Sequence, residues 1–165
     1  MRRATAAALL AVLLSGCGFQ LQGGGELPDE LRNVDVDVRV KYQVLQPPLV
    51  RALRERIERH GGVTGGGESA AQLRITTLSE VNQVLSVNAD GRAIEFLYTT
   101  TVGYELLNGG RVRVPYHQLA VSREYSFDNR QVLATEREIE QVRVALQEEL
   151  ADLILLQLKA ELKSS

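Results

Sequence analysis

The sequence predicts an α+β domain in which two helices pack on one face of a four-stranded sheet, in the order β-α-β-β-β-α. Three observations predict it: a strictly alternating apolar segment near the N-terminus, a β-rich stretch divided by two glycine turns, and a long apolar helical stripe near the C-terminus. A helix buries its apolar stripe against the apolar face of a sheet, so both helices are expected on the same face. The opposite face, polar and rich in threonine, is left uncovered.

The first strand is predicted over residues 34–40, where valine alternates with charged residues and one side is therefore buried. A helix is predicted after Pro47-Pro48, a pair suited to the first helical turn, because apolar residues then recur at helical spacing. These apolar residues are Leu49, Leu53 and Ile57. Gly61-Gly62 is expected to end this helix, and residues 65–67, all glycine, to form a flexible link.

A meander of three strands is predicted between Ala71 and Phe127, because turn signals at residues 88–91 and 108–110 divide this stretch into three segments. In the middle segment the two sides differ in polarity. One side carries Ile94, Phe96, Tyr98, Val102, Tyr104 and Leu106, and the other carries Glu95, Thr99, Thr101, Gly103 and Glu105. Pro115 cannot donate to a strand ladder, so the third segment is expected to hold a bulge or to lie at a sheet edge.

The closing helix is predicted to begin at a capping box formed by Thr135 and Glu138. Its apolar stripe consists of Ile139, Val142, Leu146, Leu150, Leu153, Ile154 and Leu158. Glu136, Glu138 and Glu140 are interpreted as charges that favour the positive end of the helix dipole in the first turn.

The N-terminus has the pattern of a secretory signal. Arg2 and Arg3 precede an 11-residue apolar run over residues 4–14, and small residues lead to Cys17, the single cysteine. A membrane-spanning helix needs about 20 apolar residues, so this run is too short to be one. The chain is therefore divided into a signal peptide over residues 1–16, a flexible tether over residues 17–30, and one domain over residues 31–165.

Composition excludes one class of partner and one kind of crosslink. Without Arg2 and Arg3, the 19 basic residues fall to 17 against 21 acidic ones, a net charge of −4. A nucleic-acid partner requires a basic surface, so none is expected. With a single cysteine the domain forms no internal disulfide and depends on its core for stability.

No motif predicts catalysis, a metal or a cofactor. His60 and His117, the only histidines, lie in different kinds of element without acidic neighbours at metal-ligand spacing. Both are interpreted as surface or helix C-cap residues. No nucleophile elbow or phosphate-binding glycine loop is present, so the chain is interpreted as a binding protein rather than an enzyme.

The tetrapeptide Leu14-Ser15-Gly16-Cys17 resembles a bacterial lipobox. The resemblance implies cleavage before Cys17 and lipidation of that residue, which leaves a membrane-tethered product. Two or more fatty chains hold a protein stably on a membrane, whereas one does not. Gly18 follows the cysteine where an aspartate would imply retention in the inner membrane, so the resemblance favours the outer membrane.

Three features together resemble the lipopolysaccharide-assembly lipoprotein family LptE. They are the start Cys17-Gly18-Phe19-Gln20-Leu21, the β-α-β-β-β-α order with both hairpin turns, and the stretch from Arg123 to Ala134 that leads into the closing helix. The resemblance implies a lipoprotein on the periplasmic side of the outer membrane. It implies as partners an LptD-like β-barrel, which the lipoprotein plugs and helps to assemble, and lipopolysaccharide, which it binds.

The resemblance also implies basic residues near the loop tips that contact lipopolysaccharide, because that glycolipid presents phosphates and acidic sugars. Arg92 is the first candidate, followed by Arg130 and Arg137. The sequence departs from the family pattern at two points: the arginine stands on the far shoulder of the turn, and Glu136 occupies a position expected to be basic.

Two other classes of function remain open at this stage. One is a free lipoprotein facing the periplasm that binds a peptidoglycan fragment or a small ligand. The other is a lipoprotein enzyme whose carboxylate site the sequence does not single out.

Overall fold

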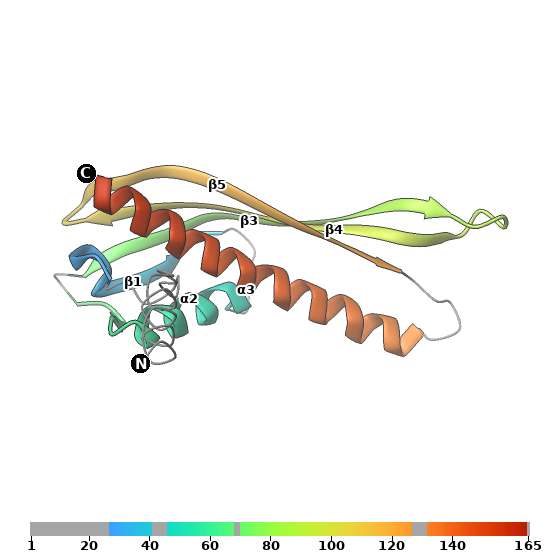
Figure 1. Cartoon of the computed structure of the whole chain (residues 1–165), viewed down its shortest axis with the longest axis horizontal. Helices are drawn as coiled ribbons and strands as arrows, with labels where there is room; N and C mark the ends of the chain where they lie inside the picture. Colours follow the sequence, from blue (N-terminus) through green and yellow to red (C-terminus); the bar gives the residue numbers. More distant parts are fainter. Residues whose placement is uncertain (1–26, 41–45, 68–69, 127–131, 165) are drawn as a thin grey trace, which may run out of the picture.

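The computed structural model describes residues 27–40, 46–67, 70–126 and 132–164 of the 165-residue chain. These residues form one sheet with two helices on one of its faces (Figure 1). In chain order the elements are η1 (Asp29–Leu31), β1 (Asn33–Val38), α2 (Pro48–Arg59), β2 (Val63–Thr64), β3 (Ala71–Val87), β4 (Ala93–Asn108), β5 (Arg111–Ser126) and α3 (Val132–Ser164).

The sheet has five strands in the order β2-β1-β3-β4-β5, so the prediction of four strands was wrong. The additional strand is β2, which pairs in parallel with the first residues of β1. Two residues are too few to show an alternating pattern, and β2 lies between two glycine groups. The predicted meander is confirmed, because β3, β4 and β5 are successive antiparallel neighbours.

The main core lies at the wide end of the molecule, where α2 and α3 cover β1 and the first half of β3. The helix predicted after Pro47 is confirmed, with Pro48 in its first turn and all three predicted apolar residues buried. Gly61 has a φ of 83°, which allows the chain to turn back after the helix. The N–H groups of Gly61 and Gly62 then bond to the carbonyls of Glu58 and Ile57, each at 2.9 Å.

Beyond this core the three long strands and the first half of α3 extend as an arm (Figure 1). A second apolar cluster holds the arm together, and it joins β4 and β5 to α3. Its buried members are Tyr98, Tyr125, Val142 and Leu146, with Phe96, Val121 and Ile139 packed against them. The stripe predicted for the closing helix is confirmed for six of its seven residues, which belong to one of the two clusters, whereas Leu153 is half-buried and belongs to neither.

The two predicted sides of β4 are confirmed. Tyr98, Val102, Tyr104 and Leu106 are buried under the helices, and Thr100 shares their face and is fully buried. The other face carries Thr99, Thr101 and Glu105 along β4, with Tyr116 of β5 over Gly103, and is not covered by any helix in the described part of the chain. Pro115 lies both on an edge strand and in a bulge, because Tyr104 pairs with His117 whereas Leu106 pairs with Val114.

The predicted start of the closing helix was wrong. α3 begins at Val132, so Thr135 lies inside the helix rather than at its N-cap. The first turn holds no acidic residue, and Glu136, Glu138 and Glu140 lie further along the helix than predicted. Glu140 instead pairs with Arg143 through two hydrogen bonds of 2.7 and 2.8 Å.

Packing begins inside the segment predicted to be a tether. Leu27 is buried and Leu31, at the end of η1, is fully buried in the main core. Cys17 and the glycines at 23–25 lie outside the described residues.

Candidate functional site

Arg92 lies at the tip of the arm, just after the turn between β3 and β4. Asn88 organises this turn: its side-chain Oδ1 accepts hydrogen bonds from the N–H groups of Asp90 at 3.0 Å and Arg92 at 2.9 Å. Gly91, with a φ of 74°, completes the turn. The backbone of Arg92 is therefore fixed, while its side chain is exposed and forms no ion pair with a described residue.

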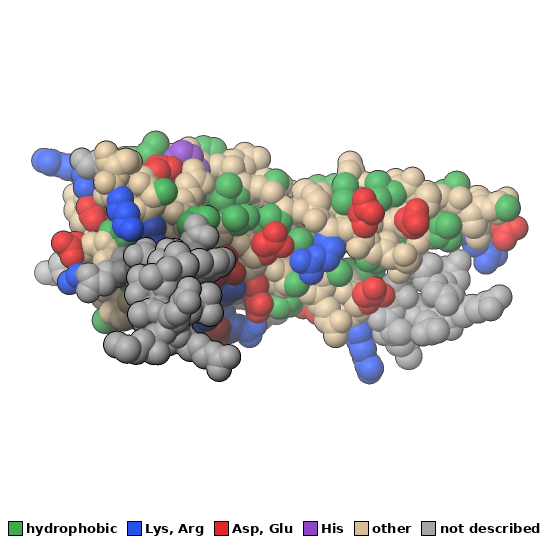
Figure 2. Space-filling view, viewed as in Figure 1, with side chains coloured by type: hydrophobic (Ala, Val, Ile, Leu, Met, Phe, Trp, Pro, Cys, Tyr) green, Lys and Arg blue, Asp and Glu red, His purple; other side chains and the backbone are tan. Residues whose placement is uncertain are grey.

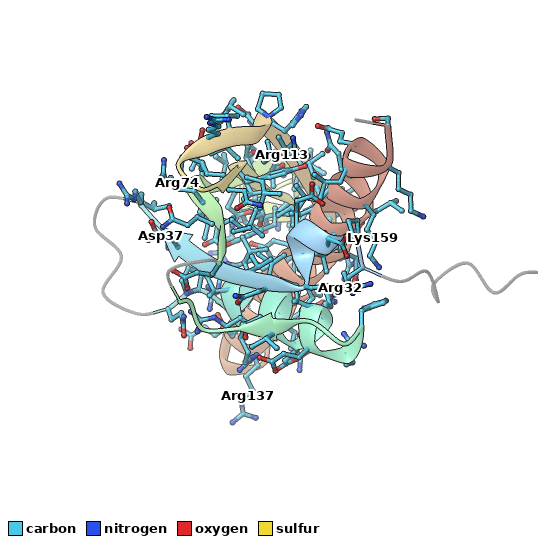
Figure 3. All side chains as sticks on the ribbon, turned by 90° about the vertical axis from the view of Figure 1, so that its left-hand side faces the viewer. Arg32, Asp37, Arg74, Arg113, Arg137 and Lys159 are labelled. Atoms are coloured by element: carbon cyan, nitrogen blue, oxygen red, sulfur yellow. The ribbon has the colours of Figure 1, made fainter. Side chains whose placement is uncertain are left out.

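Arg137 is exposed near the beginning of α3, which lies toward the same end of the molecule as the turn. In the end-on view its side chain projects away from the body (Figure 3). The two predicted arginines thus come from separate elements but share one end of the fold. Arg130, the third predicted residue, lies outside the described residues.

An exposed guanidinium presents several N–H donors in a planar fork, a geometry that suits phosphate and carboxylate oxygens. A cation without a carboxylate partner in the protein keeps its donors for a ligand. The tip is therefore chemically able to bind an anionic headgroup, although Glu136, also exposed, lies next to Arg137 and reduces the local positive charge.

A second feature of the arm, the segment Val81–Val87 at the end of β3, was not predicted from the sequence. Its large apolar side chains are exposed: Val81 by 47%, Val84 by 54%, Leu85 by 47% and Val87 by 57%. Figure 2 shows hydrophobic side chains at the surface along the arm. A run of seven residues without charge, proline or glycine was the available signal, but only the fold shows that it is uncovered.

A polar cluster lies where the arm joins the main core. Gln147 of α3 is 1% exposed and bonds to the backbone of α2 and to Glu80 of β3. Burial, and secondarily Glu80, raise the pKa of Tyr98 to about 12, so its hydroxyl stays protonated at neutral pH. Arg143 lies 4.0 Å from Glu80. These groups bond to one another, so the cluster connects elements rather than offering a site.

A shallow hollow of about 560 Å³ lies at the wide end, between η1 and the end of α3. It is lined by Leu27, Pro28, Asp29, Glu30, Arg32, Leu162 and Lys163. Three of its charged side chains are already paired, because Arg32 lies 3.3 Å from Asp29 and Arg113 lies 2.7 Å from Glu30. The Arg113 hydrogen bond also lowers the pKa of Glu30.

The two histidines differ from each other. His60 is the C-cap of α2 and its Nδ1 lies 2.8 Å from the Arg56 carbonyl oxygen, as predicted. His117 is half-buried on the edge strand β5, and its Nε2 lies 2.9 Å from Glu161 on α3, a pairing that the sequence did not predict. Only the fold brings residues 44 positions apart together.

Within the described ranges, no three metal-ligating side chains gather in a way that could hold an ion. No described helix contains an apolar run long enough to cross a bilayer.

Residues 31–158 match the LptE family, described as lipopolysaccharide-assembly. This chain belongs to the LptE family. The LPS-assembly lipoprotein LptE of Pectobacterium atrosepticum is 32% identical over 148 residues, which cover 86% of this chain and 77% of that one. The LPS-assembly lipoprotein LptE of Yersinia pestis is 32% identical over 155 residues, with 90% and 72% covered.

Solved structures share the fold. A minor lipoprotein from Acinetobacter baumannii has a TM-score of 0.65 at 18% identity, with 79% of this chain and 92% of that chain covered. Lipoprotein B from Nitrosomonas europaea has a TM-score of 0.65 at 23% identity, with 87% and 91% covered.

Membership of the LptE family supports a role in lipopolysaccharide assembly, as a lipoprotein and not as an enzyme. It is also consistent with an outer-membrane location. The resemblance seen in the sequence is thereby confirmed at the level of the family.

Proposed function

We propose that this LptE-family protein is the lipoprotein subunit of a lipopolysaccharide translocon in the outer membrane. In this proposal the chain is lipidated at Cys17 and faces the periplasm. It plugs an LptD-like β-barrel, helps that barrel to assemble, and binds lipopolysaccharide on its way to the cell surface. The observation that carries the proposal is the family match over residues 31–158.

The shape and surface of the fold support a place inside a barrel. A wide outer-membrane barrel has a polar interior that must be filled or plugged. The uncovered face of the sheet carries hydroxyl and amide side chains, among them Thr99 and Ser122, whose hydroxyl oxygens lie 2.8 Å apart across β4 and β5. Such a face suits a polar lumen and does not suit lipid chains.

The test is a pull-down of the full-length tagged lipoprotein from membranes dissolved in a mild detergent, followed by mass spectrometry. We expect an outer-membrane barrel to be recovered in a fixed ratio to the lipoprotein. A tagged lipoprotein of another family, prepared in parallel, should recover none. If no barrel accompanies this chain, the proposed plug function is wrong.

We expect Arg92 to contact a phosphate of lipopolysaccharide. Because a hydrogen bond to a charged group contributes about 1.5–3 kcal/mol, Arg92→Ala should weaken binding by about tenfold or more in a titration with purified lipopolysaccharide. Arg111→Ala is a matched control, since Arg111 is exposed beside the turn between β4 and β5. Arg137→Ala and Arg130→Ala complete the series. Unchanged binding of Arg92→Ala, with an unchanged melting temperature, would remove Arg92 from the site.

The alternative function, a free lipoprotein that binds a peptidoglycan fragment or a small ligand, has one observation in its favour. The hollow between η1 and α3 has the volume of a small-molecule site. Its lining is largely charged and internally paired, whereas small-ligand sites are mostly apolar, so we prefer the translocon. This alternative predicts a monomer that is extracted without a barrel.

A further inference from the structure

The sheet has an unpaired edge along the arm. β1 pairs with β3 over Ala71–Ile75, and among the described residues the last backbone hydrogen bond between these two segments runs from the Arg39 N–H to the Ile75 carbonyl at 2.8 Å. From Val81 to Val87 no strand of the described chain lies beyond β3, which is bonded to β4 on its other side. We call Val81–Val87 the free edge.

The free edge has the composition of a segment that pairs readily with another strand. Its sequence Val-Asn-Gln-Val-Leu-Ser-Val contains no charge, proline or glycine, and its valines and leucine are about half exposed. Segments of six or seven residues with high β propensity and low charge stack into aggregates when an edge exposes them. An exposed edge of this kind is a predicted aggregation site, so we expect the working state of the protein to cover it.

The other edge of the same sheet is protected. β5 carries Arg111, Arg113 and Pro115 in its first five residues, and its pairing with β4 is irregular on both sides of Leu106. Charges, proline and bulges are the devices by which natural proteins prevent strands from adding to an edge. The free edge has neither charge nor proline, although its own pairing with β4 is irregular on both sides of Ser86.

We propose that the free edge pairs with an extended, uncharged segment of a partner protein, which adds a sixth strand to the sheet. This inference rests on the proposed function, because the partner it requires is the outer-membrane barrel. The alternate backbone N–H and C=O groups of β3 that do not face β4 supply the hydrogen bonds. The exposed valines favour β-branched or other apolar side chains on the partner strand. Because the edge carries no charge, a charged partner strand would form no ion pair with it.

A second copy of this chain fits the edge less well. Antiparallel pairing of two free edges directs the two molecules in opposite directions along the arm. Their Leu27 ends then lie at opposite ends of the dimer. Two copies anchored in one membrane through the residues that precede Leu27 would point the same way, so the partner is a different protein.

The experiment compares barrel recovery by three full-length variants. Val81→Lys and Leu85→Lys each introduce an edge charge of the kind that blocks strand addition. Val112→Lys is the matched control, because Val112 is 57% exposed on the protected β5 edge. We expect each edge variant to lower barrel recovery by about tenfold and the control to leave it unchanged, with the same melting temperature in all three.

Hydrogen exchange supplies a measurement that needs no variant. In the wild-type lipoprotein bound to its barrel, the amides of residues 81–87 should exchange at least about tenfold more slowly than in the free lipoprotein. If the wild type recovers a barrel, but the edge variants recover it equally well and these amides gain no protection, the inference is overturned. The proposed function then still stands. Failure of the wild type to recover any barrel would instead overturn the proposed function. A wild-type dimer that Val81→Lys abolishes would overturn the assignment to a different protein.

Discussion

Gln147 joins three elements through one buried side-chain amide. Its Oε1 accepts a hydrogen bond from the Leu49 N–H at 3.0 Å, and its Nε2 donates to Glu80 at 2.7 Å. Leu49 is in the first turn of α2, where backbone N–H groups have no partner within the helix. The preceding residues are prolines, and Pro47 at the N-cap makes no side-chain hydrogen bond. A residue from α3 therefore supplies the cap that α2 lacks locally.

We predict that Gln147→Leu lowers the free energy of unfolding by about 1–3 kcal/mol, because the replacement leaves the Leu49 N–H and Glu80 without their partner. Urea unfolding of the lipoprotein, followed by circular dichroism, measures the change. Gln141→Leu, on an exposed position of the same helix, should have little effect. Equal stability of the two variants would show that the amide is not a cap.

Gly103 is required by a close approach of Tyr116 on the uncovered face of the sheet. A Cβ atom at position 103 would lie 2.6 Å from the Tyr116 hydroxyl oxygen and 2.7 Å from the ring Cε2. The Tyr116 hydroxyl also donates to Gln118 Oε1 at 3.1 Å, which holds the ring across β4. An aromatic side chain that covers a strand glycine in this way offsets the packing that glycine cannot provide.

We predict that Gly103→Ala costs about 1–3 kcal/mol of stability, because Tyr116 must move to admit the methyl group. In a Tyr116→Ala background the same substitution should cost much less. A double-mutant cycle based on thermal unfolding gives the interaction energy directly. Additive effects of the two substitutions would contradict the contact between them.

At the scale of elements, patterns that extend over many residues predicted the structure and short local signals did not. Alternation identified both faces of β4, and helical spacing identified the buried side of α3. The capping box at Thr135 failed because a cap contributes only about 1 kcal/mol, too little to stop a helix whose upstream residues continue it. β2 was missed because its two residues are defined by their pairing with β1 and by no pattern of their own.

The contact between α2 and α3 also depends on a pair that sequence reasoning did not single out. Arg56 is nearly buried, with 12% of its side chain exposed, and donates to both carboxylate oxygens of Asp152, through Nε and, at 2.9 Å, through Nη2. These hydrogen bonds raise the pKa of Arg56 and lower the pKa of Asp152. The residues are 96 positions apart, so only the packing of the two helices brings them together.

This pair makes stability depend on pH in a defined direction. The pKa of Asp152 is lower in the folded protein than in the unfolded chain. The contribution of Asp152 to the free energy of unfolding is therefore complete above the ordinary pKa of about 3.9, and it is lost as the pH falls through the lowered value. Asp152 is 63% exposed, so solvent limits this contribution to at most about 1 kcal/mol.

We predict that Asp152→Asn melts at a lower temperature at neutral pH and loses less stability than wild type between about pH 4 and about pH 2. Asp29→Asn is the control, since Asp29 is 88% exposed in its pair with Arg32. Parallel melting curves of wild type and Asp152→Asn over this range would contradict the prediction.

At the scale of the whole molecule, the fold places its first described residue and Arg92, the proposed ligand contact, at opposite ends. The chain enters the domain at Leu27, at the wide end, whereas Arg92 lies at the tip of the arm. The 16 residues of β4 span about 50 Å, which exceeds the roughly 30 Å of a bilayer's hydrocarbon core. A domain tethered at one end and enclosed in a barrel could therefore present its tip near the opposite membrane surface.

Sequence reasoning identified Arg92 and Arg137 one at a time, by the turn and by the family resemblance. It could not place them at the same end of the molecule, because that depends on how α3 lies along the sheet. The free edge could not be predicted from the sequence for the same reason. Whether an apolar strand is covered depends on where β1 stops, and β1 pairs with β3 over only five residues.

This arrangement requires the anchor to be at the N-terminus, which gives the final prediction. If Cys17 carries fatty chains, cells grown with radioactive palmitate should label the wild-type protein, and Cys17→Ala should carry no label, because the chain has no other cysteine. The variant, produced in excess over any partner, should no longer be recovered in the outer membrane, because it lacks the fatty chains that are proposed to hold it there. Its circular dichroism should match that of the wild type, because the core begins at Leu27 and is independent of the lipid. An unlabelled wild-type protein would remove the anchor and, with it, the orientation that directs the arm and Arg92 away from the periplasm.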